Sequence, residues 1–205
     1  MTIAYIFPVP LYFDFVDDAV LNKIQREFES VFLDCQSNNK FRNKSIWDGN
    51  PDEKDHLVND PDFKSNLIDD YNLVTFKEEL VKHIDRYLET VNVSGGPIPK
   101  YTIVESWMVL NKPGSLGSFH RHLPYDLAGV YYFKTNSNDG DLRLLSTVEA
   151  PLANRPFNTM QPSNALVKPE EGKLLLFPGW LVHGSDRNTT TEDRVSVAWN
   201  IKFED

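Results

Sequence analysis

The chain has almost no cysteine, no long apolar run and a minority of basic side chains. Cys35 is the only cysteine in 205 residues, which excludes a disulfide within the chain and favours a reducing, cytoplasmic location. No segment approaches the roughly 18 apolar residues of a membrane-spanning helix, and the N-terminus lacks the basic region of a signal peptide. The 21 Lys and Arg against 30 Asp and Glu give a formal charge of −9, which argues against nucleic acid or a membrane as a partner.

The composition is that of a globular protein, and the length favours one domain over residues 1–205. Hydrophobic residues make up 40% of the chain and aromatic residues 12%, enough for a buried core. We expect helical support and loops over 1–95 and a strand-rich core over 96–205, separated by Ser94-Gly95-Gly96-Pro97. The alternative is two separate domains divided near Gly95 and Gly96, which leaves the apolar stripe of the second predicted helix without a partner.

Apolar periodicity predicts two principal helices in the first half of the chain. Asp17 or Asp18 can cap a helix that continues to about residue 35, and apolar side chains recur at helical spacing over 73–90. His83 falls within the second helix, where we expect a surface or boundary position. The remaining expectations are an edge strand at 2–13, a loop at 36–71 with one short helix near 61–68, and a long insertion at 146–171.

Three of the five histidines lie in the second half of the chain, in an order that suits a metal site. His120 and His122 stand two apart, and residues i and i+2 of a strand point the same way. His183 follows an apolar run and can bring a third imidazole from a distant strand. Three protein ligands leave metal positions open for chemistry, whereas structural zinc needs a fourth ligand. Imidazole binds iron, zinc, copper and nickel alike, so the ligands alone do not select the metal.

The last strand-like segment places an arginine on a small, polar face. Alternate side chains from residue 194 onward fall on two faces of a strand. One face is apolar and suits a core, and the other carries a guanidinium that can bind a carboxylate with two parallel hydrogen bonds. This second face has the features of a wall of an anion-binding pocket. The polar face consists of Arg194, Ser196, Ala198 and Asn200, and the apolar face of Val195, Val197, Trp199 and Ile201.

The order and spacing of these motifs resemble the Fe(II)/2-oxoglutarate dioxygenase superfamily, whose pattern is H-x-(D/E), a later His and an Arg. The chain more closely resembles a prolyl-hydroxylase-like branch of 2-oxoglutarate oxygenases found in phages and marine bacteria. The opening segment Tyr5 to Leu11 also fits this branch, so the resemblance covers most of the chain. The other matching motifs are Trp107 to Asn111, His120 to Pro124, Gly129-Val130-Tyr131-Tyr132, Leu175 to His183 and Arg194 to Asn200.

The resemblance implies a mainly β fold with supporting helices. That fold is a double-stranded β-helix, a cupin-like jelly roll, from about residue 100, with the two principal helices packed on its larger sheet. It also implies a hydroxylase that couples oxidative decarboxylation of 2-oxoglutarate by dioxygen to hydroxylation of a C–H bond. His120, His122 and His183 would hold Fe(II), Arg194 would bind the cosubstrate, and Tyr132 would add a hydrogen bond to the cosubstrate carboxylate. Asn200 shares a face with Arg194 and is a further candidate for the pocket.

The sequence departs from the superfamily pattern at His122, where a carboxylate is usual. Replacing a carboxylate by an imidazole leaves the iron site with one more positive charge. Two arrangements stay open: a three-histidine centre, or two ligands completed by water or by Asp126. Asp126 lies beyond Pro124, where we expect a turn that points it elsewhere.

Two other functions compete with the oxygenase hypothesis. A three-histidine cupin, a dioxygenase or isomerase without 2-oxoglutarate, shares the jelly roll and the H-x-H pair. Such cupins usually carry a glutamate soon after the pair, and none occurs from Leu123 to Tyr132. A non-catalytic jelly-roll binding module is the third possibility.

Loops that carry recognition on a rigid scaffold are expected at 36–71 and 146–171. These segments mix aromatic with basic side chains, which suits a peptide or a small acidic metabolite. The side chains concerned are Phe41, Arg42, Trp47, Arg155 and Phe157.

Overall fold

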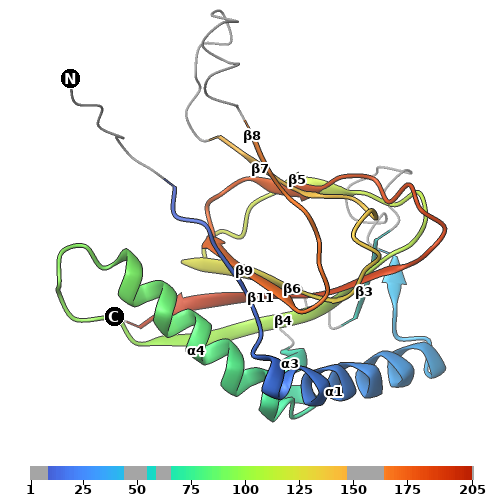
Figure 1. The fold of residues 1–205 in the computed structure, drawn as a ribbon, viewed down its shortest axis with the longest axis horizontal. Coiled ribbons are helices and arrows are strands. Elements are labelled where there is room, and N and C mark those ends of the chain that lie inside the picture. The colour runs from blue at the N-terminus through green and yellow to red at the C-terminus, as the bar shows by residue number, and fades with distance from the viewer. Residues whose placement is uncertain (1–8, 44–54, 59–65, 147–163, 205) are drawn as a thin grey trace, which may run out of the picture.

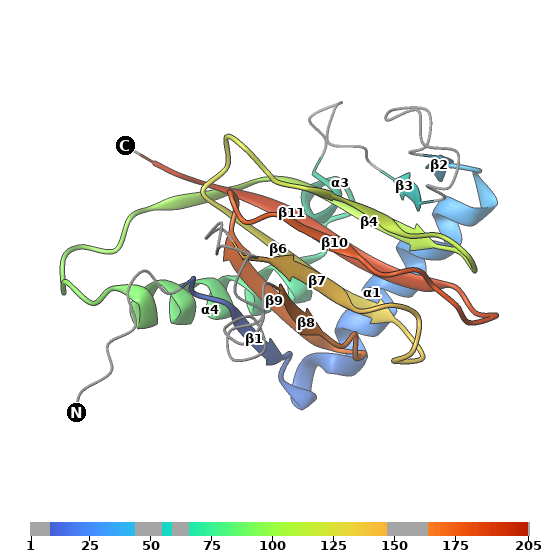
Figure 2. The same cartoon turned by 90° about the horizontal axis from the view of Figure 1, so that it is seen from above.

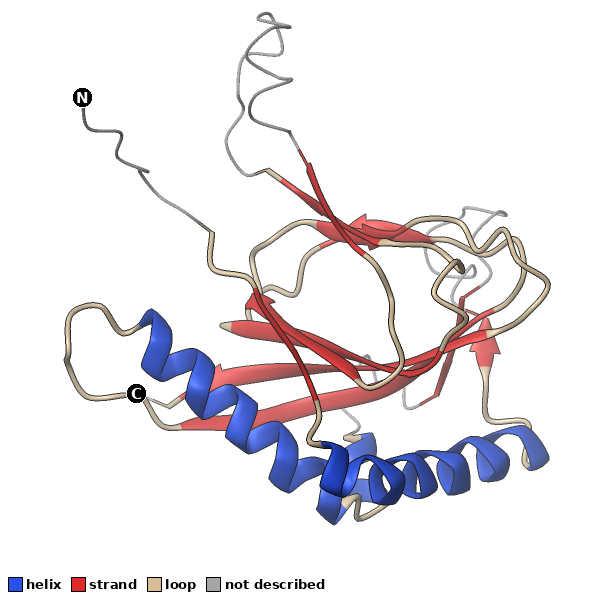
Figure 3. Ribbon diagram, viewed as in Figure 1, coloured by secondary structure: helices blue, strands red, loops and turns tan. Residues whose placement is uncertain are grey.

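The computed structural model describes residues 9–43, 55–58, 66–146 and 164–204. Three layers follow one another in Figure 1: the helices, a larger sheet and a smaller sheet. Figure 3 shows the two long helices together on one side of the larger sheet, opposite the smaller sheet. The expected jelly roll with two helices on its larger sheet is therefore confirmed. Within the described part of the chain, no helix is long and apolar enough to cross a membrane.

The larger sheet has seven strands in the order β1-β9-β6-β11-β4-β3-β2, and each neighbouring pair is antiparallel. The smaller sheet has the order β5-β10-β7-β8. Figure 2 shows the long central strands β4, β11 and β6 running side by side. The larger sheet contains β1 (Tyr12–Phe15), β2 (Arg42–Asn43), β3 (Asp55–Val58), β4 (Tyr101–Asn111), β6 (Leu127–Lys134), β9 (Lys173–Pro178) and β11 (Arg194–Phe203). The smaller sheet contains β5 (Gly117–His120), β7 (Leu142–Leu145), β8 (Asn164–Val167) and β10 (His183–Ser185).

Both principal helices begin and end close to their predicted bounds. The first, α1 (Asp18–Ser37), is capped by the Asp17 carboxylate, which accepts a hydrogen bond from the Ala19 amide at 2.8 Å. The second, α4 (Val74–Val91), has no side-chain cap from its own N-cap residue. Instead, Glu27 of α1 accepts hydrogen bonds from the amides of Thr75 and Phe76 at 2.8 and 3.0 Å. The two helices are therefore joined by a hydrogen-bonded cap as well as by apolar contact.

One cluster of buried side chains joins α1, α4 and the larger sheet. It contains the predicted apolar face of β11, from Val195 to Ile201, together with Tyr131. Trp199 and Tyr131 are fully buried, and Phe76 of α4 contacts both rings. The apolar stripe of α4 therefore has the sheet as its partner, as the alternation of β11 required.

Several expectations were wrong or fall outside the described residues. The segment 36–71 was expected as loop, yet β2 and β3 extend the larger sheet there by pairing beyond β4. The short helix near 61–68 is α3 (Leu67–Asp70), and residues 61–65 lie outside the described ranges. The insertion 146–171 contains β8. The edge strand expected at 2–13 is found only in part: β1 lies at the sheet edge but begins at Tyr12, residues 9–11 are not in a strand, and residues 1–8 lie outside the described ranges.

His83 was expected at the surface or boundary of its helix, and the structure buries it to 3% exposure. Its Nδ1 lies 2.7 Å from the hydroxyl of Tyr12 on β1, and its Nε2 lies 3.5 Å from the carboxylate of Glu79. The edge strand β1 therefore covers a part of α4 that the helical periodicity predicted to face solvent.

Candidate metal centre and anion pocket

The inner face of the larger sheet, opposite the smaller sheet, differs from the helix-covered face. On β11 it carries the small, polar side chains that the alternation predicted, and Arg194, Ser196 and Asn200 are all buried there. A second apolar cluster lies between the two sheets, and it includes Tyr132 but not Tyr131. Cross-strand neighbours on this face are Glu105 with Asn200, Trp107 with Ala198, Val109 with Ser196 and Asn111 with Arg194.

The three predicted histidines meet above this inner face. One ring nitrogen from each of His120, His122 and His183 lies within 4.8 Å of the others. The Nε2 atoms of His122 and His183 are 3.2 Å apart. With metal–nitrogen bonds of about 2.1 Å, two nitrogens at right angles around a metal lie about 3 Å apart. The donor set therefore fits a single metal ion bound by three imidazoles.

Backbone carbonyls fix the orientation of two of the rings. Nδ1 of His120 lies 2.7 Å from the carbonyl oxygen of Ser118, and Nδ1 of His183 lies 2.9 Å from that of Leu181. A carbonyl oxygen only accepts, so each Nδ1 carries the proton. The Nε2 atoms are then the ones able to bind a metal, in the manner typical of metal-binding histidines.

His122 reaches the cluster from a turn rather than from a strand. β5 ends at His120, which pairs directly with His183 on β10. The His122 amide donates to the carbonyl of Gly179 at 2.7 Å, and its ring stacks on Trp107 with centroids 5.7 Å apart. A Cβ at Gly179 would lie 2.2 Å from the carbonyl oxygen of Tyr125, so the turn packs closely there. Gly179 therefore holds the His122 turn as well as leading the chain to His183.

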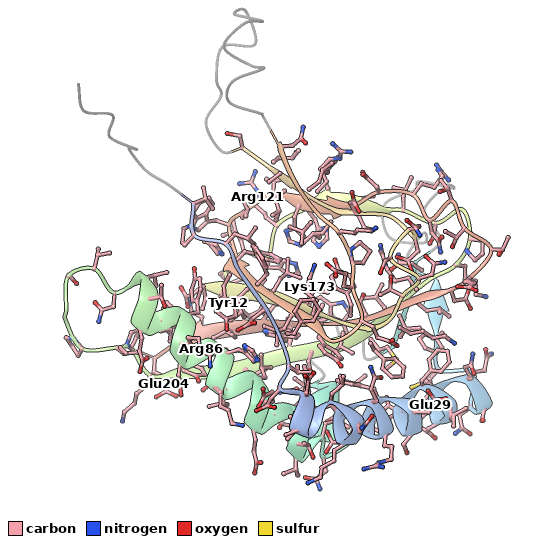
Figure 4. All side chains as sticks on the ribbon, in the orientation of Figure 1. Tyr12, Glu29, Arg86, Arg121, Lys173 and Glu204 are labelled. Carbon is pink, nitrogen blue, oxygen red and sulfur yellow. The ribbon has the colours of Figure 1, made fainter. Side chains whose placement is uncertain are left out.

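Asp126, the alternative ligand, points away from the histidines. Its carboxylate accepts a hydrogen bond from the Phe203 amide at 2.8 Å and forms an ion pair with Lys202 at 3.0 Å. Burial raises the pKa of this carboxyl. The Phe203 amide and Lys202 together lower the pKa by more than burial raises it, so the net pKa is below the usual value. Arg121, which stands between His120 and His122 in the sequence, lies on the side of the smaller sheet in Figure 4, whereas Glu29 of α1 lies on the opposite side of the molecule.

Arg194 is buried to 3% exposure, and its hydrogen bonds go to neutral acceptors. Nε and Nη2 donate to the Asn111 side-chain oxygen at 3.2 and 2.8 Å, and Nη1 donates to the carbonyls of Asp139 and Gly140 at 3.2 and 2.6 Å. Among the described residues, no carboxylate lies within ion-pair distance of this guanidinium. Buried charges are usually paired, so the arrangement suits a bound anion.

Tyr132 lies in the row of the sheet next to Arg194. It pairs with Ser196 on β11 and is buried between the sheets. Burial raises the pKa of the Tyr132 phenol to about 12, and the positive charge of Arg194 opposes part of that rise. The phenol is therefore protonated at neutral pH and keeps an O–H group that can donate a hydrogen bond.

Asn200 is buried near the opposite end of the same strand face. Six residues at about 3.3 Å each separate it from Arg194 by about 20 Å along β11. Its Nδ2 donates to Glu105 at 2.9 Å, and Tyr125 donates its hydroxyl to the other oxygen of that carboxylate. Within the described part of the chain, the Asn200 side-chain oxygen is buried without a hydrogen-bond partner. The structure therefore brings Tyr132 close to Arg194 and places Asn200 elsewhere.

Sequence reasoning missed the contacts of Glu105 and Asn111, which reach the predicted residues from the facing strand, although Asn111 ends one of the matching motifs. Glu105 is 5% exposed and Asn111 is 2% exposed. A signal was nevertheless present, because both share a period of two with Trp107 on β4. A carboxylate and an amide on one face of a largely apolar strand indicate polar partners on the strand beside it.

Comparison with known proteins agrees with this geometry. Residues 105–200 match the family model described as "Putative 2OG-Fe(II) oxygenase". The matched segment is that of an enzyme. The matched segment contains all three histidines, Arg194, Tyr132 and Asn200, and the family implies Fe(II) and 2-oxoglutarate as cofactors. No curated protein matches the sequence.

Solved structures share the fold over most of the chain. A prolyl-4-hydroxylase from Pseudomonas putida is 14% identical, with 94% of this chain and 92% of that chain covered and a TM-score of 0.59. A prolyl hydroxylase from Trichoplax adhaerens, in complex with a hypoxia inducible factor peptide fragment, is 16% identical over 92% and 82%, with a TM-score of 0.59. The non-heme alpha ketoglutarate dependent carbocyclase SnoK is 13% identical over 94% and 79%, with a TM-score of 0.65. At these identities the likeness shows a shared fold.

Proposed function

We propose that this enzyme is an Fe(II)- and 2-oxoglutarate-dependent hydroxylase. In this proposal His120, His122 and His183 hold the iron, Arg194 binds the remote carboxylate of 2-oxoglutarate, and Tyr132 donates a hydrogen bond to the same carboxylate. The observation that carries the proposal is a buried guanidinium with neutral acceptors on the sheet face beneath the histidine cluster. When bound, iron and 2-oxoglutarate with dioxygen supply oxidative decarboxylation coupled to C–H hydroxylation.

The residues of the chain would prepare the site for this chemistry before the cosubstrate arrives. The Ser118 and Leu181 carbonyls hold the protons on Nδ1 of His120 and His183 and leave each Nε2 for the iron. The Arg194 guanidinium would supply the positive charge and the planar set of donors that the remote carboxylate needs. The apolar cluster that contains Tyr132 would exclude water from the cosubstrate carboxylate and strengthen its attraction to the guanidinium.

The role of His122 as third ligand has a direct test. Iron titrated into His122→Ala should bind much more weakly than in the unchanged protein, while Asp126→Ala should keep the original affinity. The reason is that Asp126 pairs with Lys202, whereas the His122 Nε2 lies 3.2 Å from that of His183. Retained iron affinity in His122→Ala would contradict the three-histidine assignment.

Two alternatives remain distinct from this proposal: a three-histidine cupin that needs no 2-oxoglutarate, and a binding module without catalysis. The buried Arg194 favours the oxygenase, because neither alternative has a need for an uncompensated cation on that sheet face. A cupin would bind iron without a specific effect of 2-oxoglutarate, and a binding module would produce no succinate.

For the substrate we propose a peptide segment or an amino acid. The support is the fold shared with proteins named prolyl hydroxylases, one of them with a peptide fragment bound, together with the charge of −9. Of the candidate recognition side chains, Phe41 packs on Phe32 with ring centroids 5.9 Å apart, so it belongs to the helix-side core. The others, Arg42, Trp47, Arg155 and Phe157, lie outside the described side chains.

A screen for succinate release tests both the reaction and the substrate class. Purified, iron-loaded protein would be supplied with amino acids, peptides and oligonucleotides in separate assays. We expect release above the uncoupled background with an amino acid or a peptide. Turnover with oligonucleotides alone would contradict the proposed substrate class and leave the proposed cofactors in place.

We propose that residues 1–205 form one domain, supported by the buried cluster that joins α1 and α4 to the larger sheet.

We also propose that Asn200 lines the pocket, although on the histidine side rather than beside Arg194. Its support is the adjacent Trp107, which stacks on His122, and the unpaired side-chain oxygen.

A further inference from the structure

The hydrogen bonds of Arg194 use most of its donors without cancelling its charge. A guanidinium has five N–H donors. Four of them go to three neutral oxygens: the side-chain oxygen of Asn111 and the backbone carbonyls of Asp139 and Gly140. These hydrogen bonds hold the Arg194 guanidinium in place. Because all the acceptors are neutral, none of them compensates its positive charge.

Asn111 is built into the sheet directly beside the arginine. It pairs with Arg194 across β4 and β11, and both side chains are buried. Its backbone carbonyl accepts a hydrogen bond from the Asn188 side chain at 3.1 Å, which fixes the end of β4. The amide oxygen accepts from both Nε and Nη2 and so determines the direction of one edge of the guanidinium plane.

The buried acid in the neighbouring loop is engaged elsewhere. Asp139 is fully buried, and its carboxylate accepts hydrogen bonds from the Thr135 hydroxyl and the Asn136 amide at 2.7 and 3.1 Å. Only its backbone carbonyl contacts Arg194. The loop therefore presents a neutral acceptor to the guanidinium and directs its own negative charge into the turn.

We propose that Asn111 is a positioning residue that orients Arg194 and, by being uncharged, keeps the arginine available for a dicarboxylate. An aspartate at this position would accept the same hydrogen bonds but would form an ion pair and cancel the charge. Asn111 thus favours 2-oxo acids with a remote carboxylate over monocarboxylates of the same length. This inference rests on the proposed role of Arg194 in binding 2-oxoglutarate.

The test separates charge from position. Binding of 2-oxoglutarate and of 2-oxopentanoate, which has the same carbon chain without the remote carboxylate, would be measured by calorimetry on anaerobic Fe(II)-loaded protein. Asn111→Asp should weaken 2-oxoglutarate binding by about tenfold or more, the scale of losing a charge-assisted interaction. It should change 2-oxopentanoate binding little and keep the thermal stability, because the acceptor remains.

Asn111→Ala provides a second, independent variant. It leaves the arginine charged but removes the acceptor for two N–H groups, so both the thermal stability and the preference for 2-oxoglutarate should decrease. The matched control is Asn138→Asp, the same exchange at an exposed position in the loop that contains Asp139 and Gly140. The control should bind both acids as the unchanged protein does.

The outcomes distinguish this inference from the proposed function. If the unchanged protein prefers 2-oxoglutarate and Asn111→Asp keeps that preference, the role of Asn111 is wrong and the proposed function stands. An equal loss of affinity for both acids would also overturn the inference, because it indicates a purely structural role. If the unchanged protein shows no preference, the role of Arg194 fails, and the inference about Asn111 fails with it.

Discussion

The two faces of the larger sheet are filled in opposite ways. On the helix-covered face, large rings such as Trp199, Tyr131 and Phe76 pack against one another without exposure. On the inner face, the same strands carry an arginine, an amide and a carboxylate beneath a cluster of imidazoles. The alternation of a strand thus separates stability from chemistry, because substitutions on one face need not disturb the other.

The largest expected effect comes from the helix-covered face. Phe76→Ala removes a fully buried ring that contacts Phe28 with centroids 4.7 Å apart, and such truncations cost about 3–5 kcal/mol of unfolding free energy. Urea denaturation would measure the loss. The fraction of the Phe76→Ala protein that remains folded should bind 2-oxoglutarate with the original affinity. Loss of that affinity without loss of stability would break the separation of the two faces.

A smaller effect of the opposite kind is expected on the inner face. Arg194→Met should weaken 2-oxoglutarate binding by about 2–5 kcal/mol, the usual consequence of removing one partner of a buried charged pair. The stability of the cosubstrate-free protein should change much less than in Phe76→Ala, because removing a buried charge without a carboxylate partner offsets the loss of its hydrogen bonds. Calorimetry and urea denaturation on the same sample check both parts. A destabilised variant with unchanged affinity would assign Arg194 to the core.

The smallest effect concerns the pH dependence of stability on the helix-covered side. Burial lowers the pKa of His83 below its ordinary value of 6.5, although the negative charges of Glu79 and Asp14 oppose the shift. The unfolded chain therefore binds a proton more readily, and stability falls as the pH drops from about 6.5 through the lower folded-state pKa. We expect His83→Gln to lose less stability than the unchanged protein between pH 7.5 and 5.5.

Metal-free protein is the sample for this comparison, since metal binding at the three clustered histidines then contributes to stability in neither variant. An identical pH dependence of unfolding in the two proteins would contradict the account of His83. The binding of 2-oxoglutarate by the metal-loaded forms at pH 7.5 should be the same, because His83 lies on the helix side of the sheet.

The features that follow from regular repetition could be predicted from the sequence. The alternation from Val195 to Ile201 identified the core face of β11, and the helical stripe after residue 73 identified α4. The histidines could be grouped because a strand-like H-x-H pair and a distant histidine share the chemistry of one ligand set. The place where the three histidines meet depends on how the chain passes from one sheet to the other. The spacing of the histidines in the sequence allowed this arrangement but did not specify it.

The features that depend on cross-strand register could not be predicted. Nothing local shows that Asn111 meets Arg194 or that Glu105 meets Asn200, since those pairs are 83 and 95 positions apart. The burial of His83 depends on β1 covering α4, a contact between distant segments. Short strands such as β2 and β8 have too few residues to show alternation, and their existence depends on a neighbouring edge.

The central claim is that the histidine cluster and Arg194 form one site for iron and 2-oxoglutarate. Anaerobic addition of Fe(II) followed by 2-oxoglutarate, observed by visible absorption, tests it most directly. We predict a charge-transfer band that appears only with both additions, is lost in His183→Ala and requires far more 2-oxoglutarate in Arg194→Met. Iron binding without such a band, or a band with unchanged 2-oxoglutarate dependence in Arg194→Met, would contradict the claim.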